Sequence, residues 1–119
     1  MTREELRQRF RVLCVDIITM ANALPKSYSG QVIARQIIRS STSSAANYSA
    51  VCRAKSVRDF INKLKVVEEE LDETEFWLDI IVRTKILQQD KASALKDETN
   101  ELLSIIVASL KTVKSNQHS

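Results

Sequence analysis

The acidic run VEEELDETE at residues 67–75 is the densest set of side chains in this sequence that could hold a metal ion. Carboxylates in helical bundles bind paired iron or manganese ions, but those sites also need Glu-x-x-His pairs on two helices. No such pair exists here, because the only histidine is His118, near the end of the sequence. The sequence therefore predicts no metal site, and we expect the acidic run to form a solvated or salt-bridged helix face.

Other catalytic and cofactor-binding arrangements lack their essential residues. We expect His118 to be a solvated tail residue, which excludes a Ser-His-Asp triad or a phosphotransfer histidine from the folded body. Gly30 is the only glycine, so a glycine-rich phosphate loop is excluded. Cys14 and Cys52 have no CxxC spacing, and we expect them to be reduced structural residues. The sequence thus predicts no enzyme activity and no cofactor.

Basic residues carry the remaining functional signal. Residues 1–65 contain twelve Lys or Arg against four Asp or Glu, a net charge of +8, whereas residues 66–119 contain six against eleven, a net charge of −5. Such asymmetry indicates either a polyanionic partner or two faces that attract each other. Seven basic residues are candidates for contacts with RNA or DNA: Arg35, Arg53, Lys55, Arg58, Arg3, Arg7 and Arg11.

Ordinary surface charge is the competing interpretation of these basic residues. Glu5 and Arg9 have the i, i+4 spacing of a stabilising helix pair, as is common on solvated faces. Phe10, the one aromatic residue flanked by arginines, lies on the apolar stripe of the first helix, so any nucleic-acid contact is expected with phosphates rather than with stacked bases.

The elements that must position these residues are helices. The chain has one glycine and one proline, too few for the many turns of a β protein and enough for a bundle with three short connections. We expect an all-α, up-and-down antiparallel four-helix bundle in a single domain, residues 1–119, with helices at about 3–23, 30–54, 57–84 and 91–114. No apolar run is long enough to cross a membrane, and no signal peptide is evident, so we expect a cytoplasmic protein without a membrane partner.

Helix-start signals and apolar periodicity support these boundaries. Thr2 with Glu5, and Ser56 with Asp59, have the spacing of capping boxes, and Asp90 is a candidate N-cap for the last helix. The third helix keeps a heptad pattern throughout. Its apolar seam is Val57, Phe60, Leu64, Val67, Leu71, Thr74, Leu78 and Ile81.

The segment RSSTSSAANYSAVCRAKS, residues 39–56, is rich in small residues and contains no glycine or proline. A disordered linker would need such turn residues, so we expect the helix to continue through this segment. Small side chains on a buried face allow another helix to approach closely, and buried hydroxyls can bond to carbonyls of their own helix.

Several stretches resemble the four-helix-bundle proteins encoded in intervening sequences of bacterial 23S rRNA genes. The similarity covers about half of the chain and is carried by Leu24-Pro25, residues 36–39, Ser40 with Ser43 and Ser44, Ala46-Asn47, residues 53–56, Asp59-Phe60-Ile61, Lys63-Leu64, Glu73-Thr74 and Trp77-Leu78. The sequence departs from that family at Ser49 and Ala50, where glutamate often follows the asparagine, and at the glycine-free junction.

The resemblance implies a non-enzymatic bundle that assembles into a ring-shaped homo-oligomer, commonly a homopentamer. A related branch, the accessory variability protein of diversity-generating retroelements, implies nucleic acid and a reverse transcriptase as partners. The resemblance also implies a structural polar network of Arg39, Asn47 and Glu73, because an unpaired buried charge destabilises a fold by several kcal/mol. A direct nucleic-acid role of Arg39 and Asn47 is the alternative.

We therefore expect a non-enzymatic homo-oligomeric bundle that presents a basic surface to RNA or DNA backbones as an accessory to a nucleic-acid enzyme. The alternative is a pure protein–protein assembly module, in which the basic half of one copy neutralises the acidic third and fourth helices of its neighbour. A small-molecule-binding bundle is a third hypothesis, and it requires a cavity.

Overall fold

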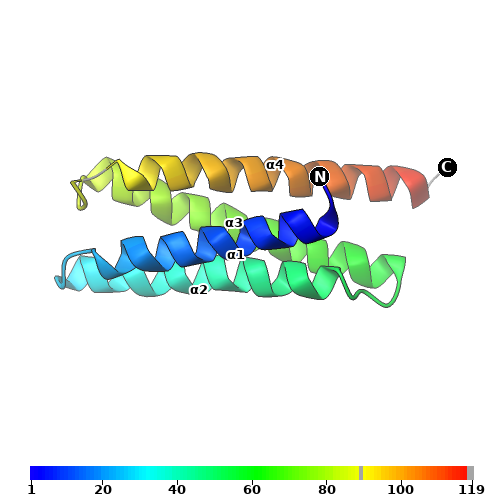
Figure 1. The fold of residues 1–119 in the computed structure, drawn as a ribbon, viewed down its shortest axis with the longest axis horizontal. Helices are drawn as coiled ribbons and strands as arrows, with labels where there is room; N and C mark the ends of the chain where they lie inside the picture. Colours follow the sequence, from blue (N-terminus) through cyan, green and yellow to red (C-terminus); the bar gives the residue numbers. More distant parts are fainter. Residues whose placement is uncertain (89, 118–119) are drawn as a thin grey trace.

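Four helices follow one another in the computed structural model, which describes residues 1–88 and 90–117. They are α1 (Arg3–Asn22), α2 (Tyr28–Val51), α3 (Val57–Thr84) and α4 (Lys91–Gln117). Short connections make each helix antiparallel to the one before it (Figure 1). Each helix packs against its sequence neighbours, and α1 also packs against α4, which closes the bundle. The all-α prediction is confirmed, in a molecule of 51 × 22 × 20 Å.

The predicted bounds of α3 agree with the structure, and those of α2 do not. α2 begins at Tyr28, before the predicted residue 30, because the Ser27 hydroxyl accepts a hydrogen bond from the Gly30 amide at 3.2 Å. It ends at Val51, before the predicted residue 54, because the amides of residues 53 and 54 bond to carbonyls three residues back. These tight turns end the α-helical hydrogen-bond pattern.

The first and last helices also differ slightly from their predicted lengths. α1 ends at Asn22, with Ala23 as its C-cap, and α4 continues to Gln117, beyond the predicted end at residue 114. α4 begins directly after Asp90, whose carbonyl accepts a hydrogen bond from the Ala94 amide at 3.3 Å. His118 lies outside the described residues.

The heptad seam of α3 lies in the apolar core from Leu64 to Ile81, whereas Val57, its predicted first member, is 53% exposed and Phe60 is partly buried. Leu71 and Leu78 have no exposed surface, and residues of α1, α2 and α4 surround them. This burial provides the main stabilisation of the bundle. The largest fully buried side chains are Phe10, Leu13, Ile17, Met20, Ile37, Val51, Leu64, Leu71, Leu78, Ile81, Leu102 and Ile106.

The small residues of α2 lie inside the bundle, as the sequence predicts. Ser40, Ser41 and Ser44 have no exposed surface, and each hydroxyl lies within hydrogen-bond distance of a carbonyl one turn earlier on α2. From α1, the Cys14 thiol donates a hydrogen bond to the Ser41 carbonyl at 3.0 Å. On α3, the Thr74 hydroxyl lies 2.8 Å from that of Ser40. Serines at these positions thus allow close approach from both sides and satisfy their own hydroxyls.

Gly30 is needed at the first turn of α2. A Cβ atom built on Gly30 would collide with the backbone carbonyl of Pro25, which folds back over the helix start. The sole glycine therefore permits the tight connection between α1 and α2.

Candidate nucleic-acid interface

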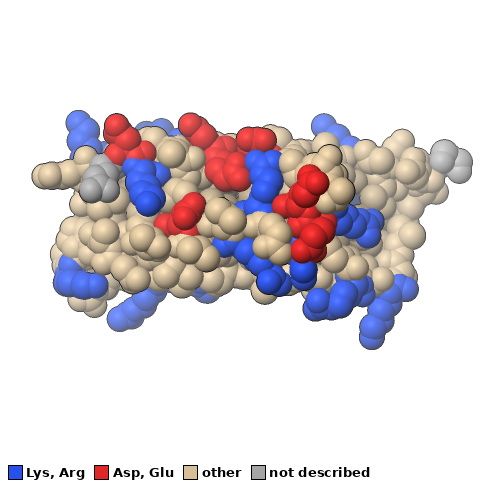
Figure 2. Space-filling view, viewed as in Figure 1, with Lys and Arg blue, Asp and Glu red and all other residues tan. Residues whose placement is uncertain are grey.

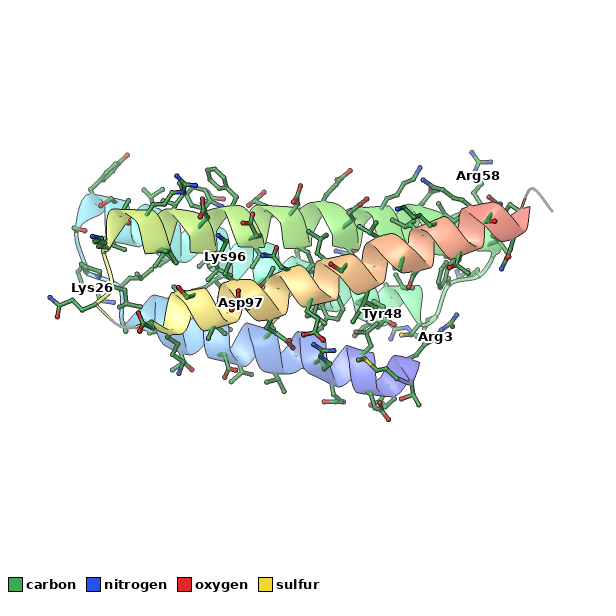
Figure 3. All side chains as sticks on the ribbon, turned by 90° about the horizontal axis from the view of Figure 1, so that it is seen from above. Arg3, Lys26, Tyr48, Arg58, Lys96 and Asp97 are labelled. Carbon is green, nitrogen blue, oxygen red and sulfur yellow. The ribbon has the colours of Figure 1, made fainter. Side chains whose placement is uncertain are left out.

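The connection between α2 and α3, together with the first turn of α3, carries three exposed basic side chains, those of Arg53, Lys55 and Arg58. Within residues 1–88 and 90–117 none of the three forms an ion pair with a carboxylate. Arg3, at the start of α1, lies at the same end of the molecule, and Figure 3 shows Arg3 and Arg58 on opposite sides of that end. We call these four residues the basic end.

Local hydrogen bonds fix the connection that carries the basic end. Ser56 caps α3 by accepting a hydrogen bond from the Asp59 amide at 3.0 Å. The Asp59 carboxylate accepts a hydrogen bond from the Lys55 amide at 3.1 Å. In the predicted capping box this carboxylate would instead bond to the amide of Ser56. Lys63 donates to the same carboxylate at 2.6 and 2.7 Å, and together with the Lys55 amide it lowers the pKa of Asp59. The Asp59 carboxylate is therefore already paired with a lysine of its own helix.

Phe60 on α3 lies beneath Arg3, and the sequence alone gave no sign of this contact. The guanidinium carbon of Arg3 lies 5.3 Å from the centre of the Phe60 ring, within the range of a cation–π interaction. The two residues are 57 positions apart, and they meet because α1 and α3 both begin at this end of the up-and-down bundle (Figure 1).

Arg3 and Phe60 both line two neighbouring grooves at this end. The loop groove, about 380 Å³, runs along the α2–α3 connection and includes Cys52, Ala54 and Lys55. The core groove, about 530 Å³, opens between α1 and α4, where Figure 3 shows α4 diverging from α1. No Asp or Glu side chain among the described residues lines either groove.

The other predicted basic residues are paired with a carboxylate, lie further along α1 or lie near the α1–α2 connection. Arg7 is bound to Glu4 by hydrogen bonds of 2.9 and 3.1 Å, which lower the pKa of Glu4 and raise that of Arg7. Arg11 is exposed one turn further along α1. Arg35 lines a separate cavity near the α1–α2 connection, and it lies about 27 Å from Arg53 along the α2 axis.

Arg39 lies against the acidic face of α3. Its guanidinium forms ion pairs with Glu73 and with Glu70, the latter at 3.1 Å, and hydrogen bonding by Glu73 raises the pKa of Arg39. The Trp77 indole donates to Glu73 at 3.4 Å. The Arg39 side chain is 49% exposed, so this cluster lies on the surface.

Asn47 does not belong to the Arg39 cluster. Its amide donates to the carbonyl and hydroxyl of Ser43, at 2.8 and 3.2 Å, one turn earlier on α2. The predicted network of Arg39, Asn47 and Glu73 therefore does not form as one unit. Arg39 pairs with Glu73, whereas Asn47 bonds to Ser43 on its own helix.

The thiols show no arrangement for catalysis. Burial raises the pKa of Cys14 to about 11, which keeps this thiol protonated. Cys52 is partly buried and borders Tyr48. Burial of the Tyr48 hydroxyl raises the pKa of this residue to about 12. In the described part of the chain, no three His, Cys, Asp or Glu side chains converge as ligands for a metal ion.

The profile of the 23S rRNA-intervening sequence protein family matches residues 3–108. The chain belongs to this family. A crystal structure of a family relative supports the assignment: a protein of unknown function from the S23 ribosomal protein family of Bacteroides thetaiotaomicron is 28% identical, with a TM-score of 0.84. The alignment covers 93% of this chain and 99% of that one. No curated protein matches the sequence.

The family assignment fits the four-helix architecture and leaves the activity open, since the solved relative has no stated function. No helix in residues 1–88 or 90–117 combines the length and the apolar character required to cross a bilayer. For this intervening-sequence protein, function must therefore be argued from its own surface.

Proposed function

We propose that this protein binds the phosphate backbone of RNA or DNA through the basic end and catalyses no reaction. The observation that carries this proposal is the set of four cations, Arg3, Arg53, Lys55 and Arg58, which form no ion pair within the described chain. By contrast, Arg39 and Arg9 in the middle of the bundle are each held by two carboxylates. Cations without internal partners remain available for phosphates.

The surroundings of the basic end strengthen its positive field. Figure 2 shows Lys and Arg side chains gathered at the end near the α2–α3 connection, with a group of carboxylates beside them toward the middle of the same face. The amino terminus of α3 lies there too, and its helix dipole adds partial positive charge. Phosphate contacts of this kind give binding that is weakly specific for sequence.

Charge reversal tests the proposal. We expect the triple variant Arg53→Glu, Lys55→Glu and Arg58→Glu to lose retention of a generic RNA or DNA in a gel shift at low salt. The matched control reverses Lys26, Lys85 and Lys91, which are exposed at the opposite end and also lack ion pairs in the described residues. Equal loss in both triple variants would show that net charge, rather than the basic end, determines binding.

The family resemblance supports three further parts of the proposal. The protein acts as a ring-shaped homo-oligomer, a pentamer, so that several basic ends contact one nucleic acid and avidity adds to each weak contact. It works in the cytoplasm as an accessory to a nucleic-acid enzyme such as a reverse transcriptase. Native mass spectrometry tests the oligomer, and co-purification with the product of a neighbouring reverse-transcriptase gene tests the partner.

Pure assembly is the second candidate function, and the unpaired carboxylates of α3 favour it. Glu69 and Asp72 are exposed and form no ion pair within residues 1–88 and 90–117. They could accept the basic end of a neighbouring copy. If this is the function, the charge-reversed triple variant should lose its oligomer on a sizing column, and wild type should retain no nucleic acid.

A further inference from the structure

Phe60 lines both the loop groove and the core groove. Its ring is partly buried against the core, and Arg3 lies over it at 5.3 Å. The loop groove thus has an aromatic wall, a guanidinium at its rim and Lys55 at its other side. Such a combination differs from a plain basic patch, which would offer charge alone.

We infer that the loop groove accepts one unstacked base of a single-stranded nucleic acid whose flanking phosphates lie on the basic end. The inference rests on the proposed function and specifies its substrate class. Proteins that bind single strands combine cations that follow the backbone with aromatic or arginine planes that contact the bases. Arg3 and Phe60 supply both planes, and Arg53, Lys55 and Arg58 supply the cations.

The size and lining of the loop groove suit a base. Its volume of about 380 Å³ lies within the range of pockets that bind small ligands, roughly 300–1,000 Å³. Its walls near the connection are the small side chains of Cys52 and Ala54, which leave room for a flat ring. No carboxylate among the described residues lines the groove, so nothing there repels the adjoining phosphates.

Bases in a duplex are paired and stacked, and they cannot enter the groove without breaking those contacts. The protein should therefore bind single strands more tightly than duplexes. Loss of one base–aromatic contact weakens single-strand binding by about tenfold. Loss of a phosphate contact weakens the binding of both single strands and duplexes.

Fluorescence anisotropy tests this inference with two probes, a labelled single-stranded RNA of mixed sequence and a labelled duplex of the same length. We expect Phe60→Leu, which keeps an apolar side chain and removes the ring, to weaken single-strand binding about tenfold and leave duplex binding unchanged. Phe76→Leu is the matched control, because Phe76 is 50% exposed on α3 and lines neither groove. Ala54→Leu, which narrows the groove without removing the ring, should reproduce the loss.

The outcomes separate this inference from the proposed function. If wild type binds both probes equally and Phe60→Leu changes neither affinity, the inference is wrong and backbone binding stands. If wild type binds neither probe at low salt, the proposed function itself fails. Circular dichroism of Phe60→Leu and Ala54→Leu must match wild type, and a loss of single-strand binding in Phe76→Leu as large as in Phe60→Leu would also overturn the inference.

Discussion

Arg9 on α1 donates hydrogen bonds of 2.6 and 3.2 Å to the Glu98 carboxylate on α4, and these bonds join the first helix of the bundle to the last. Glu101 lies 3.1 Å from the same guanidinium, and the pKa of Arg9 is raised, mainly by Glu98. The expected Glu5–Arg9 pair does not form, because the Glu5 carboxylate accepts the Thr2 amide in the cap of α1. The arginine side chain is long enough to reach a carboxylate on another helix, so i, i+4 spacing on one helix does not by itself determine the pairing.

We predict that the Arg9–Glu98 pair couples α1 to α4. A double-mutant cycle with Arg9→Met and Glu98→Gln, followed by urea unfolding, should give a coupling free energy of about 1 kcal/mol, since two-point guanidinium–carboxylate pairs are the stronger kind. The Arg83–Asp79 pair within α3, whose arginine is 75% exposed, is the control and should give about 0.3–0.5 kcal/mol. A coupling for Arg9–Glu98 no larger than the control would contradict the prediction.

A larger side chain at Ser44 should destabilise the bundle. Ser44 has no exposed surface, and its hydroxyl is bonded to the Ser41 carbonyl at 2.7 Å. Ser44→Leu should lower the free energy of unfolding by about 1–3 kcal/mol through overpacking. Ala46→Leu, on the exposed face of α2, should change it by less than about 0.5 kcal/mol. Equal effects of the two substitutions in thermal melts would argue against close packing at the serines.

Local patterns in the sequence were sufficient to predict the fold. The heptads of α3 predicted its bounds at Val57–Thr84, and the glycine-free segment after Arg39 predicted helix to about residue 54, three residues beyond the observed end at Val51. The start of α2 was predicted two residues late, because the cap at Ser27 lies within a polar stretch that resembles a loop. Such caps depend on single hydrogen bonds, and the periodicity of apolar residues does not reveal them.

The candidate site was less predictable, since it depends on contacts between distant residues. The sequence predicted the cations of the α2–α3 connection, but it argued against base contacts because no aromatic residue alternates with them. The structure brings Phe60 beneath Arg3 from another helix. Helix periodicity defines which face is buried, whereas the axial stagger of α1 against α3 depends on packing of the whole bundle.

Replacement of Gly30 should weaken the connection between α1 and α2. A methyl group there collides with the Pro25 carbonyl, a backbone atom that cannot rotate away. Gly30→Ala should lower the free energy of unfolding by about 1–3 kcal/mol, despite the higher helix propensity of alanine. Ser29→Ala, an exposed neighbour in the same turn, is the control and should have little effect. A stabilised Gly30→Ala variant in urea unfolding would show that the turn has room.

Asp79 should contribute stability that disappears in acid. Hydrogen bonds from Lys96 and Arg83, at 3.0 and 2.8 Å, lower the pKa of Asp79 below its ordinary value of 3.8. Because the folded pKa is the lower one, the stabilisation is complete above pH 3.8 and is lost as the pH falls through the folded pKa. Asp79→Asn should therefore melt below wild type at pH 7.

The difference in Tm between wild type and Asp79→Asn should shrink as the pH falls below 3.8. Asp97 provides the control, because it is exposed on α4 beside Lys96 (Figure 3) and forms no ion pair within the described residues. Asp97→Asn should melt close to wild type at pH 7. A Tm difference for Asp79→Asn that stays constant from pH 7 to pH 2 would rule out the proposed linkage.

The salt dependence of nucleic-acid binding tests the central claim most directly. If the four residues of the basic end each contact a duplex phosphate, the slope of log affinity against log salt concentration should be about −3 to −4 per protomer. The variant with Arg53, Lys55 and Arg58 changed to glutamine should have a slope near −1, with its fold and oligomer intact. A wild-type slope near zero, or the same slope in both proteins, would contradict the claim that this end binds the backbone.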